Sequence, residues 1–379
     1  MHQVEKLSSY FRLKPTATKP EEAFVPLPFE DYIVIYNDEA LKSNTYHHFN
    51  DVVEYIKTSR PDVNIVQVAN TTSTKQIEGA YCIDNISHNQ LHFLINNCEC
   101  IVSTETYAAE AAGVFNKPLV FMSGNSFSGT ARPFFFNEDI HHIIAPAEQP
   151  SFMSSAEHSV VNTITPEDVA RPVLSFIGLK DPDPSYKTVF VGESYHNRFI
   201  DYVPDFHLES NISGNIPLTV RLDLCFNISN VISTSSHSIL HLVIDKEFDL
   251  KTISDIRDKI PCIIVELNND MSVEFIKDLQ EMGCQVILHT KDKENLDSIR
   301  FKFIDWHVLF TEKAEKPKDI DDCNNLFYKS GKLTVSNNKK YISYAAKLEN
   351  KEDNKVVDRE EFWEDSDHYM IYSLDLDPQ

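Results

Sequence analysis

The sequence predicts an α/β protein in which two Rossmann-like domains each contain a parallel sheet. Apolar segments of strand length alternate with amphipathic segments of helix length over most of the chain, which is typical of parallel strands joined by crossover helices. The 379 residues are 42% hydrophobic and 25% charged, a composition typical of soluble globular proteins. A chain of this length can form more than one domain with its own core.

The first domain is expected at residues 28–150, after an N-terminal extension of residues 1–27. Phe49 and Ile56 are spaced as on one face of a helix, and Ser87 is a suitable N-cap for the next helix. The predicted strands are 31–38, 63–70, 98–104 and 118–124, and the predicted helices are 46–58, 87–95 and 107–114.

A linker is expected at residues 151–187, where the sequence DPDPSY interrupts regular structure, and a second Rossmann-like domain at residues 188–312. A helix at 271–283 has apolar residues on one face and ends at Gly283. Residues 313–379 predict a β-hairpin and then an acidic, solvent-exposed tail. The predicted strands of the second domain are 187–194, 218–224, 238–245, 261–267, 284–290 and 304–310.

Charge, hydropathy and cysteine usage exclude several functions. The formal net charge of -23 repels a phosphate backbone and argues against nucleic acid as a partner. No apolar run reaches the roughly 18 residues of a membrane span, and residues 1–15 lack the apolar centre of a signal peptide, so a cytoplasmic location is expected. The scattered cysteines predict reduced core residues. Cys98 and Cys100 lack a second pair at zinc-site spacing, so no metal is predicted.

The stretch VSTETYAAEAAGVFNKPLVFMSG, residues 102–124, places two carboxylates at the start of a helix. Glu105 directly follows the predicted strand, Thr106 can cap the helix, and Glu110 lies in its first turns. The backbone N–H groups of such a helix end can hold an anion, while the carboxylates accept hydrogen bonds from ribose or sugar hydroxyls. The alternative is that both carboxylates only complement the helix dipole.

Residues 32–136 resemble the nucleotide-sugar-binding half of glycosyltransferase family 9, the lipopolysaccharide heptosyltransferases. That half carries a lysine after its first strand, an Asp-Ser-Gly-x-x-His motif, an alanine-rich helix and a Gly-Lys-Pro turn. In this chain Lys42 follows the first predicted strand. Residues 105–107 and Glu110 match the motif positions without a gap, and residues 116–118 stand at the turn.

The resemblance implies a GT-B fold, in which two Rossmann-like domains face a cleft. The donor-binding half comes last in the family and first in this chain, so the order is expected to be permuted, with residues 188–312 as the acceptor domain. Tyr107 replaces the motif glycine and Glu110 replaces the motif histidine, which leaves the donor nucleotide open. The resemblance covers only the first part of the chain.

The activity that the resemblance implies is transfer of a sugar from a nucleotide-sugar donor to a glycan or other hydroxyl acceptor, inverting, metal-independent and without a cofactor. Transfer needs a base for the acceptor hydroxyl. Asp223, beside Arg221 in a predicted strand, is the first candidate, and His237 is the second. The expected donor-binding residues are Lys42, Glu105, Thr106, Glu110 and Arg132, with Lys75 as a further cation.

The signatures of several other enzyme classes are missing from the sequence. The sequence contains no G-x-G-x-x-G, G-x-x-x-x-G-K-[ST] or G-x-S-x-G, the usual signatures of dinucleotide oxidoreductases, P-loop NTPases and α/β-hydrolases. The remaining alternative is a noncatalytic binding or assembly protein derived from a degenerate glycosyltransferase, which fits the altered motif and the acidic tail. Stabilisation by a nucleoside diphosphate would distinguish the enzyme from this alternative.

Overall fold

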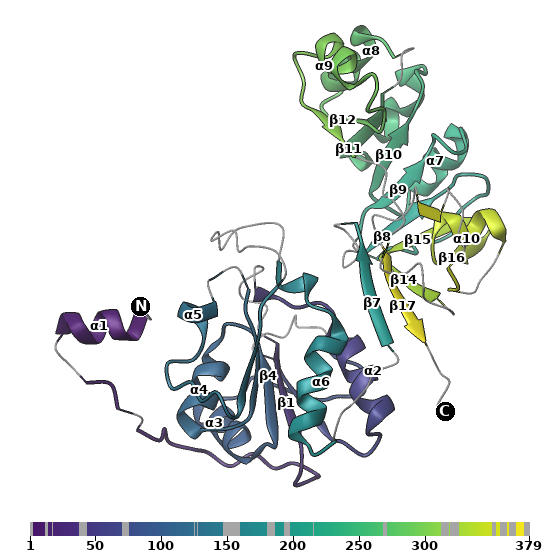
Figure 1. Cartoon of the computed structure of the whole chain (residues 1–379). Coiled ribbons are helices and arrows are strands. Elements are labelled where there is room, and N and C mark those ends of the chain that lie inside the picture. Colours follow the sequence, from purple (N-terminus) through teal and green to yellow (C-terminus); the bar gives the residue numbers. More distant parts are fainter. Residues whose placement is uncertain are drawn as a thin grey trace. The chain divides into compact units, whose positions relative to one another are not determined.

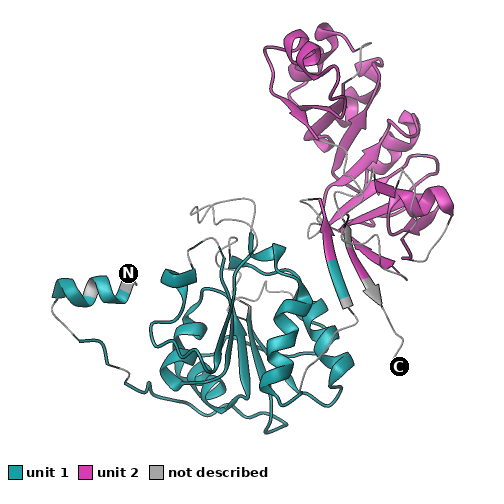
Figure 2. Cartoon of the chain, in the orientation of Figure 1, with its two compact units in different colours: residues 1–188, 375–379 teal, residues 189–374 magenta. Residues whose placement is uncertain are grey.

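The structure is a computed structural model of the chain, and it divides into two compact units, the first within residues 1–188 and the second within residues 189–374 (Figure 2). Each unit is α/β, as the sequence predicts. The residues that the structure describes are 3–11, 14–16, 18–37, 44–69, 76–124, 126, 128–146, 160–179, 186–192, 198–214, 216–267, 271–311, 318, 326–350, 354–356, 362–363 and 369–374.

Unit 1 contains a six-stranded parallel sheet with the strand order β3-β2-β1-β4-β5-β6 (Figure 1). Its strands are β1 (Ile33–Asn37), β2 (Ile65–Ala69), β3 (Tyr81–Asp84), β4 (Cys100–Ser103), β5 (Leu119–Met122) and β6 (His141–Ile144). Its helices are α1 (Gln3–Phe11), α2 (Phe49–Ser59), α3 (His88–Asn97), α4 (Tyr107–Phe115), α5 (Ser128–Ala131), η2 (Val160–Thr163) and α6 (Pro166–Phe176).

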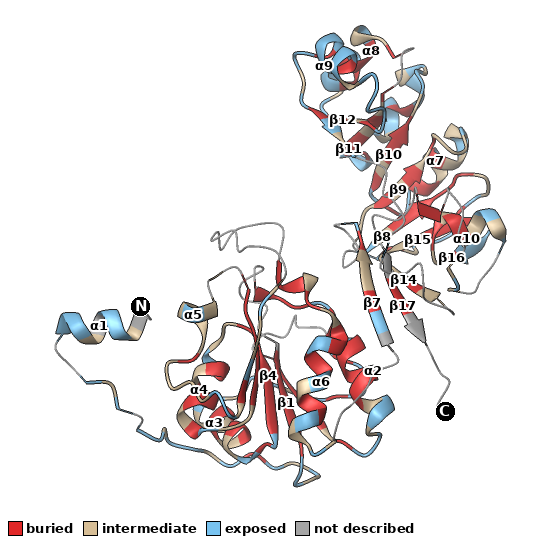
Figure 3. Cartoon of the chain, viewed as in Figure 1, coloured by how far each residue is buried: buried red, intermediate tan, exposed pale blue. Residues whose placement is uncertain are grey.

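The strand order of unit 1 reverses its direction between β1 and β4. The chain winds outward from β1 to β3 and then returns to place β4 on the other side of β1. Because crossovers between parallel strands are right-handed, this reversal puts helices on both faces of the sheet. Ile33 and Ile35 accordingly pack in the core with α2 and α6, whereas Val34 and Tyr36 pack in the core with α3 and α4. The central strands β1, β2, β4 and β5 are therefore buried on both sides (Figure 3).

Several elements of unit 1 are not predicted from the sequence, among them β3, β6 and α6. β3 and β6 are short strands at the two edges of the sheet, and apart from buried His141 their residues are exposed or half-buried and give no apolar run. α6 lies in the segment that was predicted as a linker. Thr165 caps it by accepting a hydrogen bond from the backbone N–H of Asp168, and Val169 and Val173 bury its apolar face. The turn residues at 181–186 led to the prediction of a linker over 151–187. The helix within it belongs to the core of unit 1.

Unit 2 contains an eight-stranded sheet with the order β13-β12-β11-β10-β9-β8-β15-β16, in which β16 is antiparallel to its neighbour. Its strands are β8 (Phe199–Tyr202), β9 (Leu218–Arg221), β10 (Leu240–Ile244), β11 (Cys262–Glu266), β12 (Gln285–Thr290), β13 (Val308–Phe310), β15 (Lys332–Ser336) and β16 (Lys339–Tyr341). Its helices are α7 (Ile228–Ser235), η3 (Leu250–Lys259), α8 (Val273–Glu281), α9 (Leu296–Lys302) and α10 (Tyr344–Glu349).

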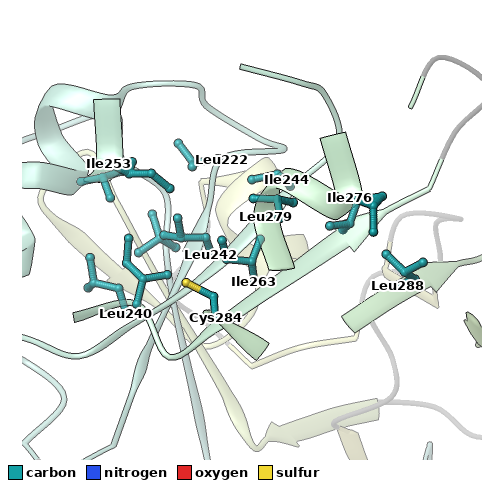
Figure 4. Close-up of a cluster of buried hydrophobic side chains, with 14 of the residues drawn as sticks. Leu222, Leu240, Leu242, Ile244, Ile253, Ile263, Ile276, Leu279, Cys284 and Leu288 are labelled. Atoms are coloured by element: carbon teal, nitrogen blue, oxygen red, sulfur yellow. The ribbon is translucent and has the colours of Figure 1, made fainter. Parts of the chain in front are cut away.

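From β8 to β13 the strands of unit 2 are adjacent in chain order. With right-handed crossovers such an order places the connecting helices on one face of the sheet. Val231 of α7, Ile253 of η3, Ile276 of α8 and Ile299 of α9 indeed share a single core with Leu242 and its neighbouring strand residues. Figure 4 shows part of this core. The sheet is therefore covered by these helices on one side, unlike the sheet of unit 1.

The C-terminal part of unit 2 is more ordered than the sequence predicts. The predicted hairpin is confirmed as β15 and β16, and Asn337 and Asn338 at its turn both have positive φ, as the commonest two-residue hairpin turn requires. The acidic tail, predicted to be solvent-exposed, contributes buried Phe362 and Trp363 to a small core. Strands β14 (Leu326–Ser330), β17 (Tyr369–Leu374) and β7 (Tyr186–Val191) form a separate three-stranded sheet in the order β14-β17-β7. β7 corresponds to the predicted strand 187–194, whereas Phe362 and Trp363 lie within a strongly charged segment that gives no apolar run.

Candidate functional site

The predicted donor-binding residues of unit 1 follow strands that meet at the reversal of strand order. Glu105 and Thr106 lie in the short loop after β4, which ends at Ser103 beside the carboxyl end of β1. Asn44 Nδ2 donates a hydrogen bond to the backbone oxygen of Glu105 at 3.3 Å, which ties the loop after β1 to the loop after β4. Open α/β sheets bind ligands at this place, outside the carboxyl ends of the strands. Lys42 and Lys75 lie outside the described residues.

The side chain of Glu105 joins the loop after β4 to the loop after β5. Its Oε1 accepts a hydrogen bond from the backbone N–H of Gly124 at 2.8 Å. Gly124 follows the carboxyl end of β5, which is the neighbour of β4 in the sheet. One carboxylate thus holds together two of the loops at this edge, so part of its role is structural.

Thr106 does not cap α4 in the way that the sequence predicts. It is the N-cap residue, but its Oγ1 is hydrogen-bonded to Ser103 Oγ at 2.6 Å and accepts no bond from the helix. Within the part of the chain that the structure describes, the first turn of α4 therefore has no side-chain cap. Its backbone N–H groups keep the direction and the partial positive charge that attract an anion.

Glu110 of α4 contacts the segment 132–136, which also contains Arg132. Glu110 Oε2 accepts a hydrogen bond from the backbone N–H of Phe134 at 3.1 Å. The guanidinium of Arg132 lies over the ring of Phe136, 4.7 Å from its centroid. The two predicted carboxylates therefore act on different loops, Glu105 on the loop after β5 and Glu110 on residues 132–136.

Tyr107, at the glycine position of the motif, belongs to an aromatic group that the sequence did not reveal. Its hydroxyl is hydrogen-bonded to His92 Nε2, and its ring meets the ring of His88 edge-on, with centroids 4.8 Å apart. Burial raises the pKa of the Tyr107 hydroxyl above its usual value. His88 and His92 are four residues apart on α3, a spacing that places them on one helical face and is the only sequence signal for this group.

The candidate bases of unit 2 lie at opposite ends of two neighbouring parallel strands, β9 and β10. Asp223 stands in a turn after the carboxyl end of β9, because the strand ends at Arg221 and not at residue 224 as predicted. His237 stands in the turn between α7 and the amino end of β10, and its side chain is exposed. The structure therefore does not bring Asp223 and His237 together.

Asp223 is held by a buried network of charges. Arg221 Nε donates to Asp223 Oδ1 at 2.9 Å, and Arg221 Nη2 donates to Asp223 Oδ2 at 2.6 Å. Arg221 Nη1 also donates to Asp201 Oδ2 at 3.0 Å, and Lys332 Nζ lies 3.3 Å from the same oxygen. If Asp223 acts as the base for an acceptor hydroxyl, it does so while both of its oxygens accept hydrogen bonds from the Arg221 guanidinium.

The described cysteines are free thiols, and most of them are buried. Burial raises the pKa of Cys98 to about 12, and it also raises the pKa of Cys100. Cys323 lies outside the described residues. Among the residues that the structure describes, no group of three or more histidine, cysteine, aspartate or glutamate side chains could hold a metal ion. The same part of the chain contains no helix with the length and hydropathy of a membrane span.

No protein-family model matches the sequence, and no curated protein matches it. Among solved structures, a glycosyl transferase family 9 protein from Veillonella parvula shares 14% identity over 46% of this chain and 50% of its own, with a TM-score of 0.33. The E. coli ADP-heptose lps heptosyltransferase II shares 15% over 47% of this chain and 52% of its own, with a TM-score of 0.31. The chain thus spans about half the length of these two proteins.

The E. coli heptosyltransferase WaaC with ADP shares 12% identity over 76% of this chain and 88% of its own, with a TM-score of 0.29. Likeness at this level does not assign an activity. Over part of its length, the chain is similar in fold to a glycosyl transferase family 9 protein and to two heptosyltransferases.

Proposed function

We propose that the protein is a glycosyltransferase that takes a sugar from a nucleotide-sugar donor and that unit 1 binds the donor. The observation that carries this proposal is the position of the motif residues 105–110. They follow β4 at the reversal of strand order beside β1, which is where open α/β sheets bind nucleotides. Their uncapped helix end supplies N–H donors, and Glu110 supplies a carboxylate, so one short segment offers partners for both a diphosphate and hydroxyls.

Each predicted residue then has a distinct role. Glu110 binds a hydroxyl-rich part of the donor, while Lys42, Arg132 and the N-terminus of α4 bind its diphosphate. The transfer is inverting and metal-independent, since cations and N–H groups can stabilise the departing diphosphate. Asp223 is the proposed base for the acceptor hydroxyl, with His237 as the second candidate.

The first test is a thermal shift measurement with a panel of nucleoside diphosphates and nucleotide sugars. A ligand that binds only the folded protein raises its melting temperature, so one nucleotide should stabilise the chain. Calorimetric titration with that nucleotide then compares Glu110→Gln with wild type. Removing the charge should weaken binding by about 1.5–3 kcal/mol, because a charge-assisted hydrogen bond is lost. Glu138→Gln is the matched control, since it removes the same charge from an exposed position of unit 1.

Two further variants separate binding from turnover. Lys42→Ala should lower turnover more than binding, because its attraction grows as charge develops on the leaving diphosphate. Asp223→Asn should abolish turnover and leave donor binding intact. If Glu110→Gln and Lys42→Ala both bind the nucleotide as wild type does, the carboxylate acts only within the fold and the proposal fails.

The second candidate function is a noncatalytic binding or assembly protein, and the packing of Tyr107 favours it. A tyrosine side chain, fixed by His92 and His88, stands where the family motif has glycine, so less space remains beside a diphosphate. A chain that no nucleotide in the panel stabilises would support this candidate over the transferase.

A further inference from the structure

The sheet of unit 2 has one face that carries accessible side chains at β11, β12 and β13. Within the described residues, the helices between β9 and β13 pack into a core on the opposite face. Ile264 and Ile287 are register partners on the accessible face, and neither belongs to that core. Leu309 of β13, the register partner of His289, is 42% exposed. A strip of partly exposed aliphatic side chains therefore crosses these three strands.

At the carboxyl ends of the same strands, three polar side chains form a hydrogen-bonded chain. Glu266 ends β11 and is the register partner of His289 in β12. His289 Nδ1 lies 2.8 Å from Glu266 Oε2, and His289 Nε2 lies 2.8 Å from Thr311 Oγ1, just after β13. The side chains of His289 and Glu266 are 14% and 30% exposed, and Thr311 is exposed. Solvent therefore reaches this row of hydrogen-bonded side chains at Thr311.

The charges around Glu266 fix the proton positions in this chain. Burial by itself would raise the pKa of Glu266, but the hydrogen bond and charge of His289, together with Lys291 and Arg221, lower it overall. Glu266 is thus an ionised carboxylate near neutral pH, and a carboxylate only accepts hydrogen bonds. A neutral His289 must then carry its proton on Nδ1 and accept the Thr311 hydroxyl proton at Nε2. Glu266 orients an imidazole whose lone pair already faces a hydroxyl.

We propose that Glu266, His289 and Thr311 form a site for a sugar or polyol hydroxyl in unit 2, with His289 Nε2 as its proton acceptor. A bound hydroxyl would take the position beside Nε2 that the Thr311 hydroxyl occupies in its absence. The aliphatic strip of Ile264, Ile287 and Leu309 can contact the C–H groups of the same ligand. A neutral hydroxyl compound also suits a chain with a net charge of -23 better than an anion does.

The catalytic part of this inference rests on the proposed transfer and assigns the base to His289 in place of Asp223, because both oxygens of Asp223 already accept hydrogen bonds from Arg221. In that case His289→Gln, and not Asp223→Asn, loses turnover. In the transfer, the acceptor hydroxyl gives its proton to His289 Nε2 while its oxygen bonds to the anomeric carbon of the donor sugar. The bond from that carbon to the diphosphate oxygen breaks, and its electron pair leaves with the diphosphate. The imidazolium, held by Glu266, then releases the proton to water. Glu266 is a positioning residue in this step because it acts through His289.

The binding part is tested by NMR of the full chain with ¹⁵N-labelled histidine, with His289 assigned from the His289→Gln variant. The probes are glucose, mannose, galactose, N-acetylglucosamine and glycerol. At least one should shift the Nε2 signal of His289 in a saturable way while the signal of exposed His307, before the amino end of β13, stays unchanged. Glu266→Gln should weaken that binding by tenfold or more, whereas Glu281→Gln, which removes the same charge from exposed α8, should not. No saturable shift with any probe would overturn the proposal.

The catalytic part is tested with any nucleotide sugar that wild-type protein turns over. General base catalysis contributes about 10²–10⁴-fold, so His289→Gln should lower kcat by that factor and leave donor affinity unchanged. Added imidazole should restore part of the turnover of His289→Ala, which a merely structural histidine would not allow. Full turnover by His289→Gln would overturn the catalytic part. Absence of turnover in wild type would count against the proposed function, and the NMR titration would still decide whether the hydroxyl site exists.

Discussion

At the scale of single residues, Arg221 and Arg60 show how burial changes the contribution of an arginine–aspartate ion pair to the free energy of unfolding. Arg221 has a side chain only 19% exposed and holds both Asp201 and Asp223, whose side chains are 5% and 12% exposed. Burial alone would lower the pKa of Arg221, but its bonds and proximity to the two aspartates raise it, so it stays charged. Arg60 forms a similar fork with Asp62, which is 74% exposed. Only the buried pair is expected to matter for folding.

Arg221→Ala should destabilise unit 2 by about 3–5 kcal/mol, because it leaves buried Asp223 without its guanidinium partner and leaves buried Asp201 with Lys332 alone. The measurement is urea unfolding of wild type and variant, followed by the fluorescence or circular dichroism of the whole chain. Arg60→Ala removes an exposed fork of the same chemistry and should leave the midpoint almost unchanged. Equal effects from the two substitutions would mean that Asp201 and Asp223 are compensated by other groups.

Buried His141 should make unit 1 less stable in mild acid. Its Nδ1 accepts a hydrogen bond from the backbone N–H of Asn137 at 3.1 Å, and its side chain is 4% exposed. Burial lowers the pKa of His141 in the folded state, so the unfolded chain takes up this proton first as the pH falls below about 6.5. Stability is therefore lost from about pH 6.5 downward and is fully present above it.

His141→Asn should reduce that loss, since the asparagine oxygen can accept the same N–H bond and does not titrate. The melting temperatures of wild type and variant should be compared between about pH 8 and pH 5, within the range where histidine changes charge. His237→Asn, at an exposed position in unit 2, serves as the control. If the melting temperature of His141→Asn falls as steeply with decreasing pH as that of wild type, groups other than His141 bind the protons.

At the scale of elements, α4 is placed by a close contact with residues 132–136. A Cβ at Gly113 would lie 2.9 Å from the backbone oxygen of Phe135 and 3.1 Å from Pro133 Cβ. Glu110, one turn earlier on α4, accepts the N–H of Phe134. Glycine is normally unfavourable inside a helix, so its presence here reflects the close approach of this segment. The helix that carries the motif and the segment that carries Arg132 are thereby fixed to one another.

Gly113→Ala should therefore destabilise the protein by about 1–3 kcal/mol, the usual effect of overpacking, although alanine is the better helix former. Gly129→Ala is the matched control, because no heavy atom lies within 4 Å of the added Cβ in α5. That substitution should be neutral or stabilising by up to about 1 kcal/mol. Urea midpoints of the two variants decide the matter, and a stabilising Gly113→Ala would show that the segment 132–136 moves away at little cost.

At the scale of the whole molecule, each unit has its own core. The cores on the two faces of the first sheet contain residues of unit 1, and the cores of the eight-stranded and three-stranded sheets contain residues of unit 2. A domain with a complete core can fold independently. The donor-binding residues that we propose all belong to unit 1.

Residues 1–188 expressed alone should fold cooperatively and bind the nucleotide selected by the panel with an affinity close to that of the full chain. Calorimetry of the full chain should show a transition that matches the melting temperature of this fragment. A fragment of residues 189–374, which lacks unit 1, is the control and should not bind the nucleotide. If the 1–188 fragment folds but does not bind the nucleotide, the motif residues of unit 1 are not sufficient to form the donor site.

The sequence by itself determined the elements whose signals are local. Ser87 caps α3 with a capping box, Gly283 with positive φ follows α8, and the helix that contains Glu110 begins at Tyr107 as expected. These features depend on neighbours a few residues apart, so spacing and cap chemistry suffice to predict them. Short edge strands such as β3 gave no such signal.

The tertiary structure alone decided which side chains meet. The order of the strands, and not their sequences, places Glu105 beside β1 and leaves one face of the second sheet without the helices between β9 and β13. Asp223 is bonded by Arg221, which also binds Asp201 of β8, and Glu266 meets His289 across two strands. Such contacts join residues that crossovers bring together from distant parts of the chain. No local periodicity encodes them, because register and strand order follow from the packing of whole elements.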